Sequence, residues 1–145
     1  MRVGDLLRRK SGNVITVTES DTVAAAVRRL LDRGVGGLAV VDEGGALTGF
    51  VSERDVVAVL NRHSGDVRHL QVTHVMRRPA VCGLEDDVTS VMQRMTSERV
   101  RHFVAVDQGR PVGVISVGDI VKQRLTELEL EAGVLRDYVA GQRAV

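Results

Sequence analysis

Residues Val35–Asp55 (VGGLAVVDEGGALTGFVSERD) decide the fold, because the stretch returns as Val100–Asp119 (VRHFVAVDQGRPVGVISVGD). A shift of 65 residues aligns the two copies as far as the hairpin, and a shift of 64 aligns them after it. Both copies end on Ser-x-x-Asp, at Ser52 and Asp55 and again at Ser116 and Asp119. Apolar spacing can recur by accident, but a polar pair repeated in the same register indicates an internal duplication.

Composition sets the limits within which this duplication is interpreted. The chain has 145 residues, a net charge of +1, 43% hydrophobic and 27% charged residues, which is typical of a soluble globular protein. The weak net charge and three aromatic residues argue against a nucleic-acid or membrane partner. The N-terminus lacks the apolar core of a signal peptide, and Cys82 is the only cysteine. We therefore expect a cytoplasmic protein in which Cys82 is a small core residue.

Each repeat reads as strand, helix, strand, strand, helix, so the sequence predicts an α/β fold of two such motifs about a pseudo-twofold. The apolar stripe of the first long helix comprises Val23, Ala26, Val27, Leu30 and Leu31, and that of its counterpart Val88, Val91, Met92 and Met95. The expected units are 1–66, 67–126 and a helical tail, 127–145. The expected elements are strands at 14–17, 38–41 and 47–51, helices at 22–33, 53–61 and 87–98, hairpin turns at 42–45 and 107–110, lead-in helical turns at 1–7 and 71–76, and a last helix after residue 116.

The last helix runs past the repeat and carries its own apolar pattern. Val121, Leu125, Leu128, Ala132, Leu135 and Val139 are spaced 4, 3, 4, 3, 4, which is the a/d spacing of a coiled-coil seam. Gly133 interrupts it at a cost of about 1 kcal/mol relative to alanine. Two interpretations remain open: an intersubunit helix, or a helix folded back on its own domain.

The two Ser-x-x-Asp pairs carry the chemistry. Each lies where a strand leads into a helix, and the free N–H groups of a helix N-terminus can hold a phosphate. One turn further, an aspartate can accept hydrogen bonds from the two hydroxyls of a ribose. The alternative is a plain capping box, which any helix can use; two register-matched occurrences favour the ligand site.

With these residues in place, the chain resembles a tandem pair of cystathionine β-synthase (CBS) domains, a Bateman module, over about residues 3–125. That resemblance implies a nucleotide sensor without catalysis, whose clefts bind AMP, ADP, ATP, NAD or S-adenosylmethionine, which needs no cofactor or metal, and which forms a homodimer acting on a separate effector protein. It implies that Asp55 and Asp119 hold ribose and that Ser52 and Ser116 meet phosphate. The implied pocket walls are Ile15, Thr16, Val17, Gly37, Leu38, Ala39, Pro79, Ala80, Val81, His102, Phe103 and Val104.

Other charged or metal-binding candidates are weaker. Arg54, Arg101 and His102 are the basic residues that the sequence places at the clefts, and we expect them to face phosphate. The clusters at 8–10 and 77–78 are interpreted as solvated loops rather than polyanion sites. His63, His69 and His74 are irregularly spaced for zinc. The alternative functions are an enzyme acting on a nucleotide, and an interaction module with degenerate clefts.

Overall fold

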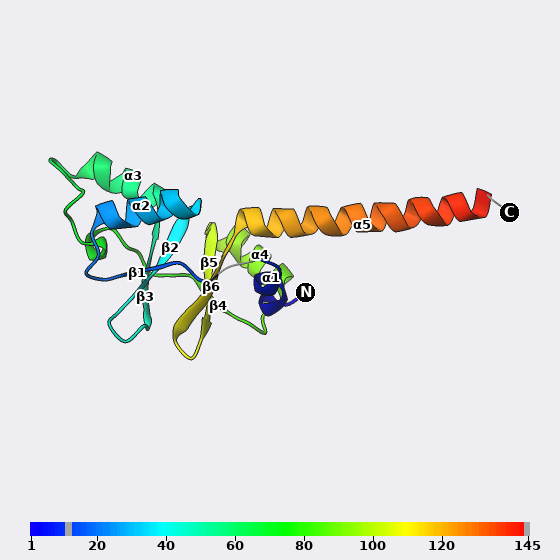
Figure 1. The fold of residues 1–145 in the computed structure, drawn as a ribbon, viewed down its shortest axis with the longest axis horizontal. Helices are drawn as coiled ribbons and strands as arrows, with labels where there is room; N and C mark the ends of the chain where they lie inside the picture. The colour runs from blue at the N-terminus through cyan, green and yellow to red at the C-terminus, as the bar shows by residue number, and fades with distance from the viewer. Residues whose placement is uncertain (11–12, 144–145) are drawn as a thin grey trace.

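The computed structural model describes residues 1–10 and 13–143 and has two three-stranded sheets, each with its own helices (Figure 1). In the first motif, β1 (Thr16–Thr18) pairs in parallel with β2 (Gly37–Val41), which pairs antiparallel with β3 (Leu47–Ser52). In the second motif, β4 (Val81–Gly83), β5 (His102–Asp107) and β6 (Arg110–Ser116) repeat this order. The predicted α/β fold of two related motifs is confirmed.

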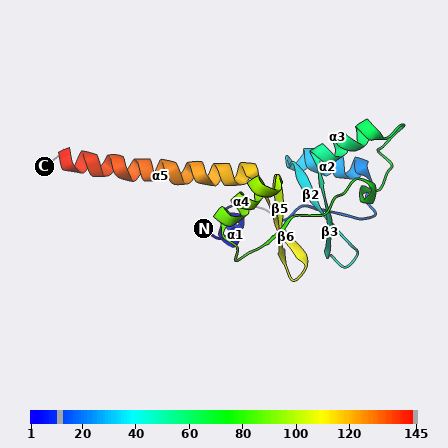
Figure 2. The ribbon, with the colours of Figure 1, turned by 180° about the vertical axis from the view of Figure 1, so that it is seen from behind.

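The helices cover one face of each sheet, as the views from front and behind show (Figure 2). At the start of α2 (Val23–Arg33), the Thr22 hydroxyl accepts a hydrogen bond from the Ala25 amide. The helix ends at Gly34, whose φ of 62° is the left-handed conformation that glycine tolerates. α3 (Glu53–Arg62), α4 (Val88–Glu98) and α5 (Val117–Arg143) complete the two motifs. The predicted buried strand is confirmed, because every residue of β2 is buried.

Two residues of the predicted inward stripes lie outward instead. Leu31 of α2 is 75% exposed and Met92 of α4 is 40% exposed, whereas Leu30 and Val91 are buried as predicted. The apolar stripe on each helix is wider than the face that its own sheet covers, so its edge is left in solvent. Cys82 is buried in the second core, as expected.

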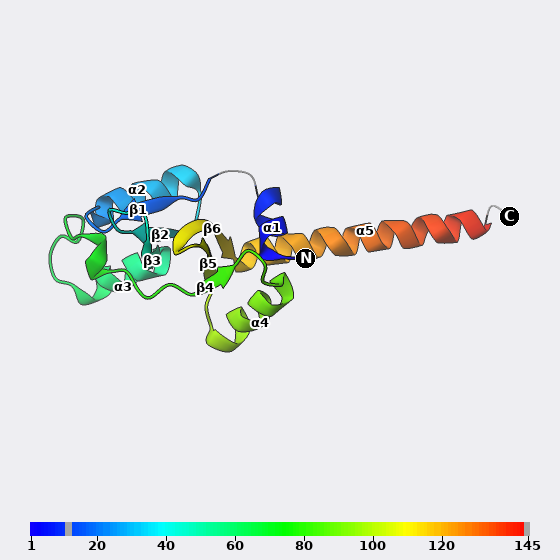
Figure 3. The same cartoon turned by 90° about the horizontal axis from the view of Figure 1, so that it is seen from below.

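The segments that precede the motifs are exchanged between them (Figure 3). α1 (Val3–Arg9) comes before the first motif but packs in the second core, where Val3 and Leu6 are buried and Val3 N–H donates to the Asp86 carbonyl. The turn η1 (Val72–His74) comes before the second motif, but Val72 is buried in the first core. Each core is therefore completed by a segment from the other half of the chain, which makes the two motifs interdependent.

A small third core joins the two sheets. Ala39, Phe50 and Val104 are buried together between β2, β3 and β5. Phe50 also lies 5.2 Å, centroid to centroid, from the ring of His102. This contact fixes the separation of the sheets, and with it the shape of the space between the motifs.

Candidate functional site

Asp119 stands at the start of α5 and is held by its own helix cap. Its Oδ2 accepts hydrogen bonds from the Ser116 amide at 2.8 Å and the Ser116 hydroxyl at 3.0 Å, while the Asp119 amide donates to Ser116 Oγ at 3.1 Å. Asp55 and Ser52 repeat this arrangement at the start of α3, with distances of 2.8, 2.9 and 3.2 Å. Both pairs thus form the capping box, and in each pair the two bonds from the serine fall on the same carboxylate oxygen.

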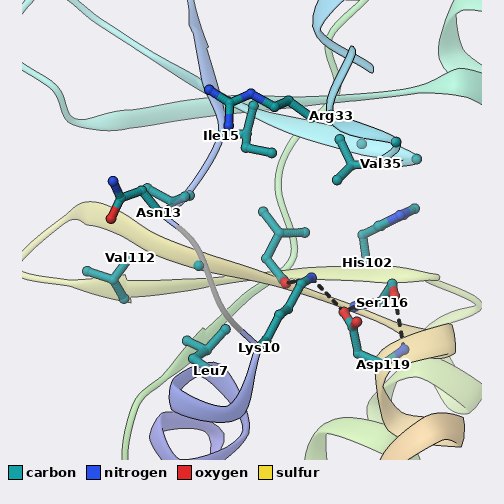
Figure 4. Close-up of a pocket in the computed structure, with 16 residues that line it drawn as sticks. Leu7, Lys10, Asn13, Ile15, Arg33, Val35, His102, Val112, Ser116 and Asp119 are labelled. Atoms are coloured by element: carbon teal, nitrogen blue, oxygen red, sulfur yellow. Dashed lines mark hydrogen bonds and ion pairs between the residues drawn. The ribbon is translucent and has the colours of Figure 1, made fainter. Parts of the chain in front are cut away.

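A cation from the other half of the chain meets each carboxylate. Lys10 follows α1 and donates to Asp119 Oδ2 at 2.8 Å and to the Val114 carbonyl at 2.8 Å (Figure 4). Arg77 precedes β4 and places its Nε 3.3 Å from Asp55 Oδ2. Because α1 and η1 are exchanged between the cores, each cation lies beside the carboxylate of the opposite half of the sequence. The basic clusters at 8–10 and 77–78 were interpreted as solvated loops, so Lys10 and Arg77 were not expected at the carboxylates.

A cavity of about 450 Å³ opens beside Asp119, between the two motifs. Its walls come from the segments that enter β1 and β2 in the first motif and from β5 and β6 in the second. Val14 and Ile15, predicted to lie in the first strand, instead precede it and line this cavity. The predicted site residues that line it are Ile15, Gly37, His102, Ser116 and Asp119, joined by Leu7, Lys10, Asn13, Val14, Arg33, Gly34, Val35, Gly36, Val112, Gly113 and Val114.

His102 lies at the inner end of this cavity, where the two motifs meet. Its Nδ1 is buried and has no hydrogen-bond partner among the described residues. Burial, followed by the positive charges of Arg77 and Lys10, lowers the pKa of the imidazole below its ordinary value, while Asp119 and Glu53 oppose the shift. A neutral His102 therefore lines the cavity, while its unpartnered Nδ1 is buried.

The electrostatics of Asp119 favour its ionised form. Burial alone would raise the pKa of the carboxyl, but the hydrogen bonds from Lys10 and the Ser116 amide outweigh burial and hold the pKa below its ordinary value. Asp119 is therefore a carboxylate at neutral pH. One of its oxygens is engaged by the cap, and its other oxygen has no hydrogen bond from the described residues.

Several predicted wall residues do not present side chains to the cavity. Leu38, Ala39, Phe103 and Val104 are at most 1% exposed, and Val17 is equally buried. These residues are core, so a ligand could meet only their backbone. Thr16 is half-buried in β1, and Pro79, Ala80 and Val81 lie at the entrance to β4, on the side of the molecule that holds Arg77 and Asp55.

Arg54 and Arg101 are not at the cavity where Asp119 lies. They line a separate depression of about 350 Å³, together with Met92 of α4 and Val121 of α5. The sequence placed these two arginines beside the phosphate because they flank Asp55 and His102 along the chain. Arg54 follows Glu53 on α3, however, and its side chain points to the helical side of the molecule, so the cations at the cavity are Lys10 and Arg33 instead.

Within residues 1–10 and 13–143, no group of three or more His, Cys, Asp or Glu side chains is arranged to hold a metal ion. No described helix combines the length and the apolar character that crossing a membrane requires.

Comparison with known proteins agrees with this geometry. The family model described as CBS domain matches residues 3–62 and 72–125. The chain is 29% identical over 148 residues to the mitochondrial CBS domain-containing protein CBSX3 of Arabidopsis thaliana, covering 96% of this chain and 72% of that protein. It is 33% identical over 114 residues to an inosine-5'-monophosphate dehydrogenase of Methanocaldococcus jannaschii, of which it spans only 22%.

Two solved structures share the fold over most of their length. A CBS-domain containing protein from Agrobacterium tumefaciens superposes with a TM-score of 0.79 at 31% identity, covering 86% of this chain and 99% of that one. A CBS domain protein from Pyrobaculum aerophilum, solved in complex with AMP, gives 0.78 at 24% identity and covers 91% and 99%.

Proposed function

This chain belongs to the CBS domain family as a tandem pair, and on that premise we propose that it binds an adenine nucleotide in the cavity beside Asp119. The observation that carries the proposal is a carboxylate paired with Lys10 on one wall of a cavity whose opposite wall holds Ile15, Val35 and Arg33 (Figure 4). We place the ribose hydroxyls on Asp119, the phosphate near Lys10 and the start of α5, and the base against Ile15 and Val35.

The size and chemistry of the cavity support a mononucleotide. A volume of about 450 Å³ lies in the lower half of the range of about 300–1,000 Å³ found for small-molecule sites. AMP has a ribose diol that matches the carboxylate of Asp119, a phosphate that matches Lys10 and the start of α5, and a flat base that matches the apolar side chains of Ile15 and Val35. ADP, ATP and NAD carry the same adenosine part, and the groups beyond their first phosphate would extend from the cavity toward solvent.

The proposed role is regulatory and non-catalytic, acting on a separate effector protein through a change in the arrangement of the motifs. A ligand that contacts both motifs favours whichever arrangement it fits better. The complex of the relative from Pyrobaculum aerophilum with AMP supports the ligand class. We also propose that the chain is a homodimer; the cytoplasmic location remains a prediction from composition.

Calorimetric titration with adenosine, AMP, ATP, NAD and S-adenosylmethionine tests the proposal, and Asp119→Asn is the decisive variant. Loss of a charge-assisted hydrogen bond costs about 1.5–3 kcal/mol, so AMP affinity should fall by about 10-fold to 150-fold. Asp55→Asn is the matched control, because it removes the equivalent carboxylate of the other motif, which does not line this cavity. If no adenosine ligand binds the wild-type chain, the protein is an interaction module with degenerate clefts.

A further inference from the structure

The exposed half of α5 presents an apolar stripe that its own domain does not cover. α5 leaves the second motif and runs along the long axis of the molecule, away from the first motif (Figure 1). Its predicted seam stays in solvent, and the large residues on it, Val121, Leu125, Leu128, Leu135 and Val139, are 39–63% exposed. The helix does not fold back, which removes one of the two interpretations drawn from the sequence.

The packing of α5 on its own domain fixes which face of the helix is free. Ile120 and Gln123 are buried, and Arg9 donates to the Gln123 side chain. With Leu125 at heptad position a and Leu128 at position d, Ile120 occupies position c and Gln123 position f. Both positions lie on the side of the helix opposite the seam. The seam therefore points away from the domain and is available to a second helix.

We propose that a second copy of this chain covers the seam, as a parallel coiled coil with both helices in register, which deepens the homodimer part of the proposed function. The positions that flank the seam support this orientation. In a parallel pair, a g residue faces the e residue five positions later on the partner. Arg124 would face the partner's Glu129, and Glu131 would face the partner's Arg136, so both pairs join opposite charges.

The antiparallel arrangement with the greatest overlap brings like charges together. In that arrangement e faces e and g faces g across the seam. With Leu128 opposite the partner's Ala132, Glu129 would face the partner's Glu129, and Glu131 the partner's Glu131. Lys122 would face the partner's Arg136, which is a third repulsive contact. The charge pattern thus favours the parallel arrangement over its main competitor.

The free apolar surface continues from the seam onto the body of the molecule. Val121 shares a depression with Met92 of α4 and with Arg54 of α3. Val57 and Leu60, one and two turns beyond Arg54, are 63% and 58% exposed. A parallel coiled coil has its twofold axis along α5, and this axis sets each motif of one protomer beside the same motif of its partner. Leu130 and Val134 lie on the opposite side of α5 and stay exposed in this dimer.

Disulfide trapping in the full chain tests the orientation. Leu125→Cys and Leu135→Cys, made singly, should each give a covalent dimer on mild oxidation, since each residue faces its own copy only in a parallel, in-register pair. The two sites are about 15 Å apart along the helix, so no single antiparallel register joins both to themselves. Asp137→Cys, on the outer face of α5, is the matched control and should give no covalent dimer. The wild type shows whether buried Cys82 alone forms a disulfide under the same conditions. Trapping at only one site, or at neither, overturns the proposal.

Charge reversal measured by sedimentation gives a second, independent readout. Arg124→Glu and Glu129→Arg each turn two symmetric attractive pairs into repulsive ones, and each should weaken the dimer about fivefold to thirtyfold. The double variant restores opposite charges in the parallel pair, and its dissociation constant should return to within about threefold of the wild type. A double variant that shows no recovery overturns the parallel arrangement, because Arg124 and Glu129 do not face each other in the antiparallel one. A wild-type chain that is monomeric at every concentration overturns the dimer, while AMP titration reports separately on the cavity.

Discussion

Gly37→Ala is expected to destabilise the protein much more than Gly36→Ala, although the two glycines are neighbours on the same wall. A Cβ at position 37 would lie 2.7 Å from Phe50 Cε1 and closer still to Phe50 Cζ. Carbon atoms in contact prefer about 3.5–4.0 Å, so the ring must move by roughly 1 Å or more. Phe50 is 3% exposed, in the small core between the sheets, and has no free space to move into.

The cost follows from the two contacts that Phe50 makes. Overpacking a well-filled core costs about 1–3 kcal/mol, and disturbing the aromatic pair with His102 adds about 0.5–1.5 kcal/mol. A total of about 1.5–4.5 kcal/mol corresponds to a fall in Tm of about 6–18 °C, at about 4 °C per kcal/mol for a chain of this size. At position 36, the nearest atom to a new Cβ is His102 Nε2 at 3.4 Å, an ordinary contact. Gly36→Ala should therefore change Tm by less than about 3 °C while narrowing the cavity.

Thermal unfolding followed by circular dichroism measures both variants, and Phe50→Leu supplies the double-mutant cycle. The shorter side chain leaves room for the new methyl group, so Gly37→Ala should be much less costly in the Phe50→Leu background than in the wild type. Equal costs in the two backgrounds, or equal Tm values for Gly36→Ala and Gly37→Ala, would refute the assignment of Phe50 as the spacer between the sheets.

Two further predictions concern the cations and His102 at the cavity. Lys10→Met should reduce the preference for AMP over adenosine by about fivefold, because a partly exposed cation facing phosphate contributes about 1 kcal/mol; an unchanged ratio in calorimetry contradicts this placement. His102 has a lowered pKa, so it is neutral at pH 7, and a bound phosphate raises that pKa and drives proton uptake. AMP binding should therefore take up more protons near pH 6.5 in the wild type than in His102→Asn, measured in buffers of different ionisation enthalpy; equal uptake in the two proteins means that the proton is carried by the phosphate alone.

The elements of this fold could be predicted from sequence because their signals are local. The Ser-x-x-Asp pairs mark where α3 and α5 start, and an unbroken apolar run marks β2. The outward positions of Leu31 and Met92 could not be predicted, since a wide apolar stripe does not say how much of it one sheet can cover. That limit depends on the size of the neighbouring element, which is a tertiary property.

The cavity was only partly predictable, and the reason is the exchange of the lead-in segments. Ile15, Ser116 and Asp119 follow from the repeat, because each keeps its place within a motif. Lys10 and Arg77 do not, since their neighbours in space belong to the opposite motif. One signal was present in the chain: both clusters are basic, and both stand just before the first strand of a motif. Arg54 and Arg101 do not line this cavity, and their contact with phosphate stays a prediction.

The two walls of the cavity bear on how a ligand could act through the fold. Lys10 and Asp119 lie on the second core, whereas Ile15 and Val35 pack on the first, so a ligand that engages both walls senses how the motifs are arranged. On the proposed function, the ligand shifts that arrangement only as far as its affinities for the two states differ, about 1.4 kcal/mol for each factor of ten. Asp119, the residue proposed to meet the ribose, also belongs to the capping box of α5, and α5 continues without a break from Val117 to Arg143. On the two proposals together, a small rotation at that cap would be carried along one helix to the seam, where the register of two copies would report it.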